Sequence, residues 1–328
     1  MTSNIDLVLK ELFSLQRLGI KVGLEHTKEL LDSIGNPHFH LKFIHIAGTN
    51  GKGSTCAILN KILIEHGMVV GLYTSPHLVR FNERIQINNE KITDADIAIF
   101  MDRHINRIKN IQTTFFETTT AMAFDYFNNK SVDIAIIETG LGGRLDSTNV
   151  ISPAVCGISS VSLDHMDILG GTIQKIAKEK AGIIKDNIPI VTFDQNKFVI
   201  DIIKKTAERK NAALTVIKKS DIELLSIDDK GTSFNYKNYT INLPLSGEHQ
   251  ILNCVLAINI AESIINNIEP DKVNKAVLNT SWLGRIEKLT KNDIYFDVAH
   301  NYDGIKAMIN TVKSNHPQKK LFALFFNF

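Results

Sequence analysis

The segment 41–55, LKFIHIAGTNGKGST, restricts the possible folds more strongly than any other part of the chain. The largely apolar run 41–47 predicts a buried strand, and residues 53–66 predict a helix. Between them, glycines let the backbone turn tightly with its N–H groups pointing inward. The helix N-terminus adds about half a positive charge, and Lys52 adds a full one. This order of strand, turn and helix predicts an α/β fold with a polyphosphate bound at the turn.

The residues expected to contact the polyphosphate form the turn itself: Thr49, Asn50, Gly51, Lys52, Gly53 and Ser54. The strict pattern G-x-x-x-x-G-K-[ST] is not met, because glycine follows the lysine and the first glycine stands one residue too close. A plain glycine-rich turn is therefore the alternative. A second glycine cluster at 140–143 does not fit a dinucleotide site, because G-x-G-x-x-G needs glycine where Leu145 stands.

Short apolar runs alternate with longer helical patterns along most of the chain, which predicts a mostly parallel sheet flanked by helices. Further strands are expected at 69–75, 132–139, 154–163 and 188–193, and helices at 94–109, 118–129, 172–185 and 247–267. The β-rich stretch 211–243 predicts a small antiparallel insertion or a sheet edge. A boundary near 280–293 suggests two parts: a domain that carries the phosphate loop, 1–283, and the start of a C-terminal α/β domain, 284–328.

Composition narrows the class of protein. The 37 basic and 35 acidic side chains give a net charge of +2, which offers no electrostatic footprint for nucleic acid. No apolar run is long enough for a membrane span, and the N-terminal residues lack the apolar core of a signal peptide. The three cysteines form no C-x-x-C pair, which indicates a reduced, cytoplasmic protein.

Two polar side chains lie at the carboxyl ends of predicted strands. In open α/β sheets, ligands bind at that end of the strands. Glu138 ends the predicted strand 132–139, and a buried carboxylate there is costly unless it meets a cation such as phosphate-bound Mg²⁺. A helix-capping or salt-bridged glutamate is the alternative. His165 follows the next strand. Alone it would more often be structural, but beside a phosphate loop and Glu138 a functional role is favoured.

Lys180 is predicted to lie on the buried face of its helix. It stands four residues from both Ile176 and Ile184, which belong to the apolar stripe of 172–185. A lysine on a buried face must be paired, deprotonated or chemically modified. Extension of its charged end to the surface is the alternative.

Five motifs in this order resemble the folylpolyglutamate synthase/dihydrofolate synthase family of the Mur ligase superfamily. They are HIAGTNGKGST, YTSPHLVRFNERI, IETGLGGRLDSTN, SLDHMDILGGTIQKIAKEKAGIIK and FDVAHN. The resemblance runs from about residue 15 to about residue 310 and implies the central domain of a Mur ligase. It also accounts for the irregular phosphate loop, because GTNGKGS is that family's form. The sequence departs from the family at Leu283, where proline is common.

The resemblance implies roles for individual residues. Those matching the ATP phosphate cradle are Thr49, Asn50, Gly51 and Lys52. Those matching magnesium ligands are Ser75, Glu138 and His165. Lys180 matches a lysine that is carbamylated by CO₂ and supports a second Mg²⁺, so Lys52, His165 and Lys180 are the expected catalytic residues. Asn253 resembles the residue that contacts adenine, and Arg285 and Asp297 match ATP-binding positions at the domain junction.

The resemblance further implies two segments that contact a pteroate substrate. The residues concerned are Thr114, Phe115, Phe116, Glu117, Leu145, Asp146 and Ser147. Aromatic rings such as those of Phe115 and Phe116 suit stacking on a flat pterin.

The implied reaction is ATP-dependent ligation of L-glutamate to dihydropteroate or to a folate through an acyl phosphate, by a bifunctional, monomeric enzyme. Only 31 residues follow Asp297 (328 − 297), fewer than the roughly 50 of a domain. The family continues into a full C-terminal domain, whereas this sequence ends in the apolar, strand-like run LFALFFNF. A truncated chain that binds ligands but ligates glutamate weakly is therefore expected. The alternatives are another Mur-type amide ligase and a non-catalytic nucleotide-binding remnant.

Overall fold

The computed structural model describes residues 5–19, 23–289 and 293–324. Its main sheet has eight strands in the order β4-β3-β2-β5-β1-β6-β7-β8. The six neighbouring strands β2, β5, β1, β6, β7 and β8 are parallel to one another. At one edge of the sheet, β3 pairs antiparallel with β2 and β4 pairs antiparallel with β3. Their bounds are β1 Phe43–Ala47, β2 Val70–Tyr73, β3 Ile85–Ile87, β4 Glu90–Lys91, β5 Ile134–Glu138, β6 Val155–Ile158, β7 Ile190–Phe193 and β8 Leu214–Ile217.

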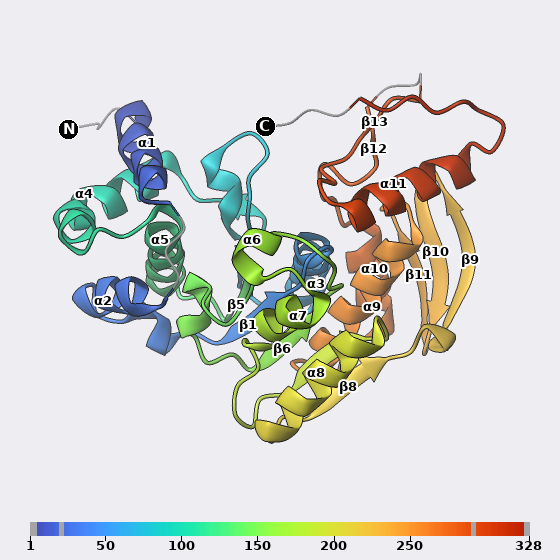
Figure 1. Ribbon diagram of the computed structural model, residues 1–328, viewed down its shortest axis with the longest axis horizontal. Helices are drawn as coiled ribbons and strands as arrows, with labels where there is room; N and C mark the ends of the chain where they lie inside the picture. Colours follow the sequence, from blue (N-terminus) through green and yellow to red (C-terminus); the bar gives the residue numbers. More distant parts are fainter. Residues whose placement is uncertain (1–4, 20–22, 290–292, 325–328) are drawn as a thin grey trace.

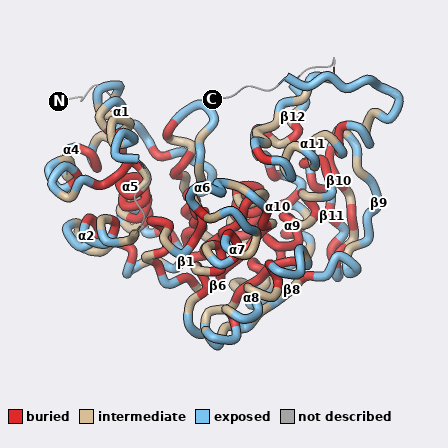
Figure 2. The backbone as a smooth tube through the Cα atoms, in the orientation of Figure 1, coloured by how far each residue is buried: buried red, intermediate tan, exposed pale blue. Residues whose placement is uncertain are grey.

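Helices cover both faces of the sheet (Figure 1). One face packs against α3 (Lys52–Glu65) and α9 (Glu248–Glu262), with α10 (Pro270–Leu278) beside them. Both α3 and α9 are buried along most of their length because each lies between the sheet and other elements. The opposite face carries α1 (Ile5–Ser14), α2 (Glu25–Ser33), α4 (Asp94–Ile111), α5 (Phe115–Asn129), α7 (Ile173–Ala181) and α8 (Lys197–Arg209). Figure 2 shows the buried residues concentrated in α5 and the central strands.

The expected strands and helices are present, with shifted ends. The helix predicted over 172–185 ends at Ala181, and Gly182 follows it in close contact with Arg144. The helix predicted to begin at 118 begins at Phe115, because Thr114 and Glu117 cap its first turn reciprocally. A single-turn helix, α6 (Met166–Leu169), follows β6 and was not expected.

The predicted antiparallel insertion is confirmed as a separate sheet of β9 (Ile222–Asp228), β10 (Gly231–Tyr236) and β11 (Tyr239–Leu243). Alternate residues of β11 are buried against the α9–α10 side of the core. The stretch 211–243 is not uniform, however, since β8 within it extends the parallel sheet.

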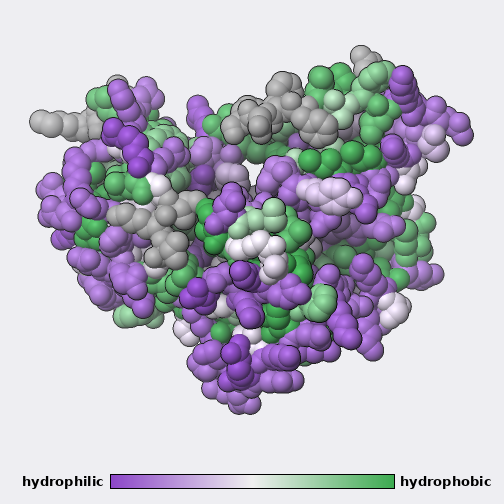
Figure 3. All heavy atoms as spheres, in the orientation of Figure 1, coloured by the Kyte–Doolittle hydropathy of each residue, from purple (hydrophilic) through white to green (hydrophobic). Residues whose placement is uncertain are grey.

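Residues 284–324 contain the short antiparallel pair β12 (Glu287–Lys288) and β13 (Tyr295–Phe296), followed by α11 (Tyr302–Asn315). Figure 1 places α11 beside α9, near the small sheet. Apolar residues gather along this segment in Figure 3, and Leu289, Phe322 and Leu324 are exposed. The last apolar run forms no strand over 321–324, and residues 325–328 lie outside the described part. No helix in the described ranges is both long and apolar enough to cross a membrane.

Candidate active site at the carboxyl edge of the sheet

A cavity of about 620 Å³ lies at the carboxyl ends of β1, β2 and β5, between the phosphate loop and the C-terminal segment. Its lining brings together residues that are up to about 250 positions apart in the chain. The sequence-predicted residues among them are Thr49, Asn50, Gly51, Lys52, Gly53, Ser54, Ser75, Glu138, Asn253, Arg285 and Asp297. Thus the predicted nucleotide-binding residues all line one cavity.

The phosphate loop is held in an open shape by its neighbours. The N–H group of Thr49 donates to the Ser160 carbonyl over 2.6 Å, and Ser159 Oγ donates to the Asn50 carbonyl over 2.8 Å. Gly51 has a φ of 88°, and a Cβ there would lie 2.1 Å from Asn253 Oδ1. Only glycine therefore fits this position, where α3 begins and its free N–H groups meet the cavity.

The loop also carries buried hydroxyl groups without partners. Ser54 Oγ and Thr55 Oγ1 are buried and make no hydrogen bond within the described part of the chain. A buried polar atom without a partner costs free energy, so these hydroxyls are suited to ligand or cation contact. Ser54 lines the cavity as well. This arrangement fits a phosphate-bound divalent cation.

Glu138 and Lys52 face each other across the cavity floor. Glu138 Oε1 lies 3.9 Å from Lys52 Nζ, and Glu138 Oε2 accepts the Ser75 N–H over 3.1 Å. Glu138 is only 4% exposed. Burial raises the pKa of this carboxyl, and the nearby Lys52 and the Ser75 N–H oppose the rise. A buried carboxylate held by one long ion pair is the environment that a divalent cation completes.

Lys180 is 4% exposed, which confirms the predicted inward position and excludes extension of its amine to the surface. Its Nζ donates to the Gly48 carbonyl over 2.7 Å, directly behind the phosphate loop. Burial, together with the charge of Lys52, lowers the pKa of this amine to about 7, against the opposing effect of Asp164 and Asp146. A neutral amine is therefore accessible near neutral pH.

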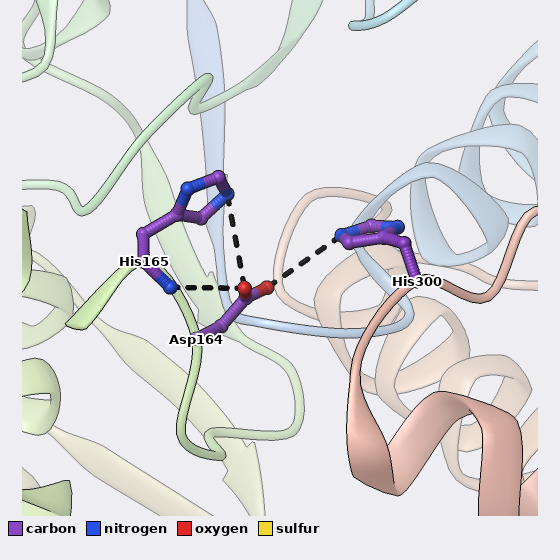
Figure 4. A group of neighbouring side chains, drawn as sticks. All are labelled: Asp164, His165 and His300. Carbon is purple, nitrogen blue, oxygen red and sulfur yellow. Dashed lines mark hydrogen bonds and ion pairs between the residues drawn. The ribbon is translucent and has the colours of Figure 1, made fainter. Parts of the chain in front are cut away.

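His165 does not line the cavity. It lies beside Asp164 in the loop after β6, and Figure 4 shows Asp164 between it and His300. Asp164 carboxylate oxygens lie 3.9 Å from His165 Nε2 and 3.6 Å from His300 Nε2. Ligand atoms of the three residues are close enough together to hold one cation. The sequence analysis missed Asp164 and His300, although both stand inside quoted motifs, because only the fold brings them together.

Arg285 and Asp297 form the wall on the C-terminal side. Asp297 accepts the N–H groups of Ile286 and Ala299 over 2.8 and 2.7 Å, which fixes its carboxylate at the turn after β13. Burial lowers the pKa of Arg285, and Asp297 and Glu138 oppose that shift. A half-buried guanidinium that lies near two carboxylates is positioned to meet a phosphate or ribose oxygen.

The predicted pteroate-contacting residues form a second group that does not line this cavity. Thr114 and Glu117 cap α5, with the Thr114 N–H donating to Glu117 Oε2 over 2.6 Å. The Phe115 ring stacks on Phe13 at 5.5 Å, whereas Phe116 is half-buried. Of the two rings, Phe116 therefore has the more open surface.

The GLGGR turn lies close to this ring. A Cβ on Gly140 would lie 2.5 Å from the Phe116 ring, so glycine allows the close approach. Asp146 is buried and accepts the Leu141 N–H over 2.7 Å and the Thr148 N–H over 3.0 Å. Leu145 is half-buried and Ser147 is buried. The structure thus brings Phe116 next to the turn that carries residues 145–147, while their role stays a prediction.

Comparison with known proteins places these residues in a family context. Residues 46–261 match the Mur ligase middle domain. The chain is 37% identical to a dihydrofolate synthase/folylpolyglutamate synthase of Bacillus subtilis over 94% of its own length and 76% of that protein. It is also 37% identical to a folylpolyglutamate synthase of Lacticaseibacillus casei over 87% of this chain and 71% of that protein. A solved complex described as FPGS with AMPPCP and folate superposes with a TM-score of 0.88 at 33% identity, covering 96% of this chain and 82% of that one.

Proposed function

This chain belongs to the folylpolyglutamate synthase/dihydrofolate synthase family, and we propose that its cavity joins L-glutamate to dihydropteroate or to a folate. It is an ATP-dependent amide ligase. The observation that carries the proposal is the single cavity shared by the phosphate loop, Glu138, Asn253, Arg285 and Asp297.

The chemistry follows from charge and position. The acceptor carboxylate attacks the γ-phosphate of ATP, which releases ADP and forms an acyl phosphate, and the glutamate amine then displaces phosphate from the activated carbonyl. The loop N–H groups and Lys52 bind the phosphate oxygens, while Arg285 and Asp297 hold the nucleotide from the other wall. Such a reaction depends on positioning and electrostatic stabilisation rather than on a protein nucleophile.

We propose that Ser75, Glu138 and His165 provide ligands for Mg²⁺, in two sites. When bound, Mg²⁺ would neutralise phosphate charge and orient the γ-phosphate for in-line transfer. The unpartnered Ser54 hydroxyl and the buried Glu138 carboxylate support this assignment. Carbamylation of Lys180 by CO₂ would replace a buried amine by an anion and so supply the second site. Its pKa of about 7 leaves the neutral amine that this reaction requires.

The acceptor is proposed to contact the second group of residues, Thr114 to Glu117 and Leu145 to Ser147, with Phe116 against the pterin. Use of both dihydropteroate and folates is the favoured assignment. We also propose a division of the chain at 283/284 and a monomer in the cytoplasm. The three cysteines are buried and free, which agrees with a reducing compartment.

Transfer of ¹⁸O from a labelled acceptor carboxylate tests the proposed reaction. Ligation through an acyl phosphate places one acceptor oxygen in the inorganic phosphate that is released. We expect labelled phosphate only when ATP, Mg²⁺, acceptor and glutamate are all present. Release of unlabelled phosphate at the same rate without acceptor would identify an ATPase and reject the assignment.

A further inference from the structure

Arg84 is a buried cation to which the proposed function assigns no role. It ends the short 3₁₀ helix Phe81–Arg84, directly before β3, and is only 8% exposed. Its carbonyl accepts the Thr74 N–H over 2.9 Å, which fixes its backbone next to Ser75 at the carboxyl end of β2. Arg84 was not predicted as a site residue, although it stands in the motif that contains Ser75.

The positive charge of Arg84 has no carboxylate partner in the described part of the chain. Its side chain has one hydrogen-bond acceptor there, His77 Nδ1, which lies 2.7 Å from Arg84 Nε. Arg84 Cζ lies 5.1 Å from the centre of the Phe115 ring, a cation–π contact that offsets only part of the cost of burying a charge. Burial lowers the pKa of Arg84, against the opposing effect of Tyr73 and Glu138. An anion from a ligand would complete this environment.

Two acids near Arg84, Glu83 and Glu138, have other partners. The Glu83 carboxylate accepts the N–H groups of residues 78–80 at 2.8, 3.3 and 3.0 Å. The Glu138 carboxylate faces Lys52 Nζ at 3.9 Å. Neither acid lies within ion-pair distance of Arg84, so neither neutralises the guanidinium.

The contact with Arg84 determines which nitrogen of His77 carries the proton. Arg84 Nε donates in this bond, so His77 Nδ1 accepts, and the proton of the neutral imidazole is on Nε2. The His77 ring lies between Phe13 and Phe81, with centroid distances of 6.1 and 6.4 Å. His77 is half-buried, and none of the described residues accepts a hydrogen bond from its Nε2. The pair therefore offers a ligand the terminal N–H groups of Arg84 and the Nε2–H group of His77.

Arg84 lies between the proposed pterin site and the carboxylate that faces the phosphate loop. On one side its guanidinium contacts Phe115, the residue before Phe116. The ring of Tyr73, on the adjoining strand, lies 6.0 Å from the Phe116 ring. On the other side Arg84 is close enough to Glu138 that its charge opposes the rise in pKa that burial causes there. An acceptor with its pterin at Phe116 would therefore bring its carboxylate past Arg84 on the way to the γ-phosphate.

We propose that Arg84 binds the acceptor carboxylate that becomes phosphorylated. This inference rests on the proposed function, because it takes the acceptor to be a pterin that carries a carboxylate at its far end. Arg84 donates to one carboxylate oxygen and leaves the other oxygen to attack the γ-phosphate. His77 holds the guanidinium in place and donates from Nε2 to the same oxygen. Neutralising the carboxylate in this way lets it approach the anionic phosphate.

The chemistry predicts that Arg84 serves binding more than acceleration. The oxygen that it holds becomes the carbonyl oxygen of the acyl phosphate, and it loses negative charge as the other oxygen bonds to phosphorus. Arg84 therefore interacts more strongly with the bound carboxylate than with the transition state, and such an interaction lowers KM without raising kcat. We expect R84M to raise the KM for dihydropteroate about 10-fold to 100-fold, with a smaller change in kcat.

Comparison of dihydropteroate with the same molecule lacking its carboxylate tests the assignment. The dissociation constants of both are measured by calorimetry with Mg²⁺ and a non-hydrolysable ATP analogue. The native chain should bind the form with the carboxylate more tightly. In R84M this preference should fall about 10-fold to 100-fold, the size of a charge-assisted hydrogen bond, through weaker binding of the form with the carboxylate alone.

Three further variants separate the effect of the guanidinium from other effects. R84K keeps a charge but not the planar set of donors, so it should lose part of the preference. R209M removes an arginine from the exposed face of α8 and should retain all of it. If R84M does not fold, H77F provides the second test. It removes the partner of Arg84 but keeps a ring between Phe13 and Phe81, and a smaller loss of preference is expected.

The outcomes separate this inference from the proposed function. If R84M keeps the native ratio of the two constants, Arg84 does not bind the carboxylate, even where both forms bind more weakly. If R84M instead weakens binding of the ATP analogue alone, or raises only the KM for glutamate, Arg84 serves a phosphate or the incoming amino acid and the assignment is again wrong. In these cases the proposed function stands. If the native chain binds no pterin acceptor, the proposed function fails and this inference fails with it.

Discussion

At the scale of single residues, the site contains charged side chains that are removed from water, although desolvation of a charge costs free energy. Glu138 and Lys180 are buried and Arg285 is half-buried around the cavity, and desolvation disfavours the charged form of each. Such groups lower stability in the free protein and gain their partners when ligands bind. Replacing one of these residues should therefore lower activity without lowering the stability of the ligand-free protein.

The variant E138Q should lose activity without losing stability. Burial raises the pKa of Glu138, so the folded state holds its proton more tightly than the unfolded state does. The free energy of unfolding therefore falls as the pH rises from the pKa of the unfolded state through that of the folded state. At neutral pH the charged carboxylate destabilises the folded protein. We expect E138Q to melt at the same or a higher temperature without ligands, while its ligation rate falls about 100-fold.

Thermal unfolding and steady-state rates, measured on the same preparation, check this expectation. E208Q, on the exposed face of α8, is the matched control and should change neither quantity. An E138Q variant that ligates at the native rate would show that this carboxylate does not serve the reaction.

Lys180 should carry a carbamate whose amount depends on pH. Its amine has a pKa of about 7, lowered mainly by burial, so the neutral form grows as the pH rises past 7. In the free protein, stability also rises with pH between about 7 and the model-peptide value of about 10.4. ¹³C NMR with labelled CO₂ should detect one protected carbamate that is absent in K180R and present in K204R. Full ligation without that signal at any pH would contradict the assignment.

At the scale of elements, the loops after parallel strands do most of the positioning. Asn301 is the clearest case, because it caps α11 and also joins three segments. Its Oδ1 accepts the Gly304 N–H over 3.0 Å, and its Nδ2 lies 2.9 Å from Asn50 Oδ1 and 3.0 Å from Asp164 Oδ2. The phosphate loop, the loop after β6 and α11 therefore meet at one side chain.

The variant N301A should loosen both α11 and nucleotide binding. Loss of a helix cap costs about 1 kcal/mol, and here the bonds to Asn50 and Asp164 are lost as well. Hydrogen exchange of the α11 amides should accelerate, and the affinity for ATP should fall. N196A removes the equivalent cap of α8, where Asn196 accepts the Phe198 N–H over 2.9 Å, and should leave ATP affinity unchanged. Equal ATP affinity in both variants would refute the coupling.

Local patterns predicted the parallel sheet, the phosphate loop and the inward face of Lys180, because each depends on neighbours in sequence. For 211–243 they left open an insertion or a sheet edge, and the folded chain has both, with β8 at the edge of the main sheet and β9 to β11 in a separate sheet. Nor could they place Asp164 next to His300. Those contacts arise from strand register and from the position of the C-terminal segment, which only the folded chain specifies.

At the scale of the whole molecule, the cavity lies between the main sheet and the C-terminal segment that begins at residue 284. Polar contacts join this segment to the rest of the chain in two regions. At one, Asn301 links α11 to the phosphate loop. At the other, Lys288 Nζ lies 2.9 Å from Asp229 at the β9–β10 turn, and His316 Nε2 lies 3.2 Å from the same carboxylate. These contacts hold Arg285 and Asp297 against the cavity.

The central claim is that this cavity joins glutamate to a folate-type acceptor with ATP. Mass spectrometry of reactions containing dihydropteroate, L-glutamate, ATP and Mg²⁺ tests it most directly. The expected result is a product heavier than the acceptor by one glutamyl residue, formed only when all components are present and about 100-fold more slowly by E138Q. Complete absence of that product, and of any product from a folate acceptor, while the protein is folded and binds ATP, would contradict the claim.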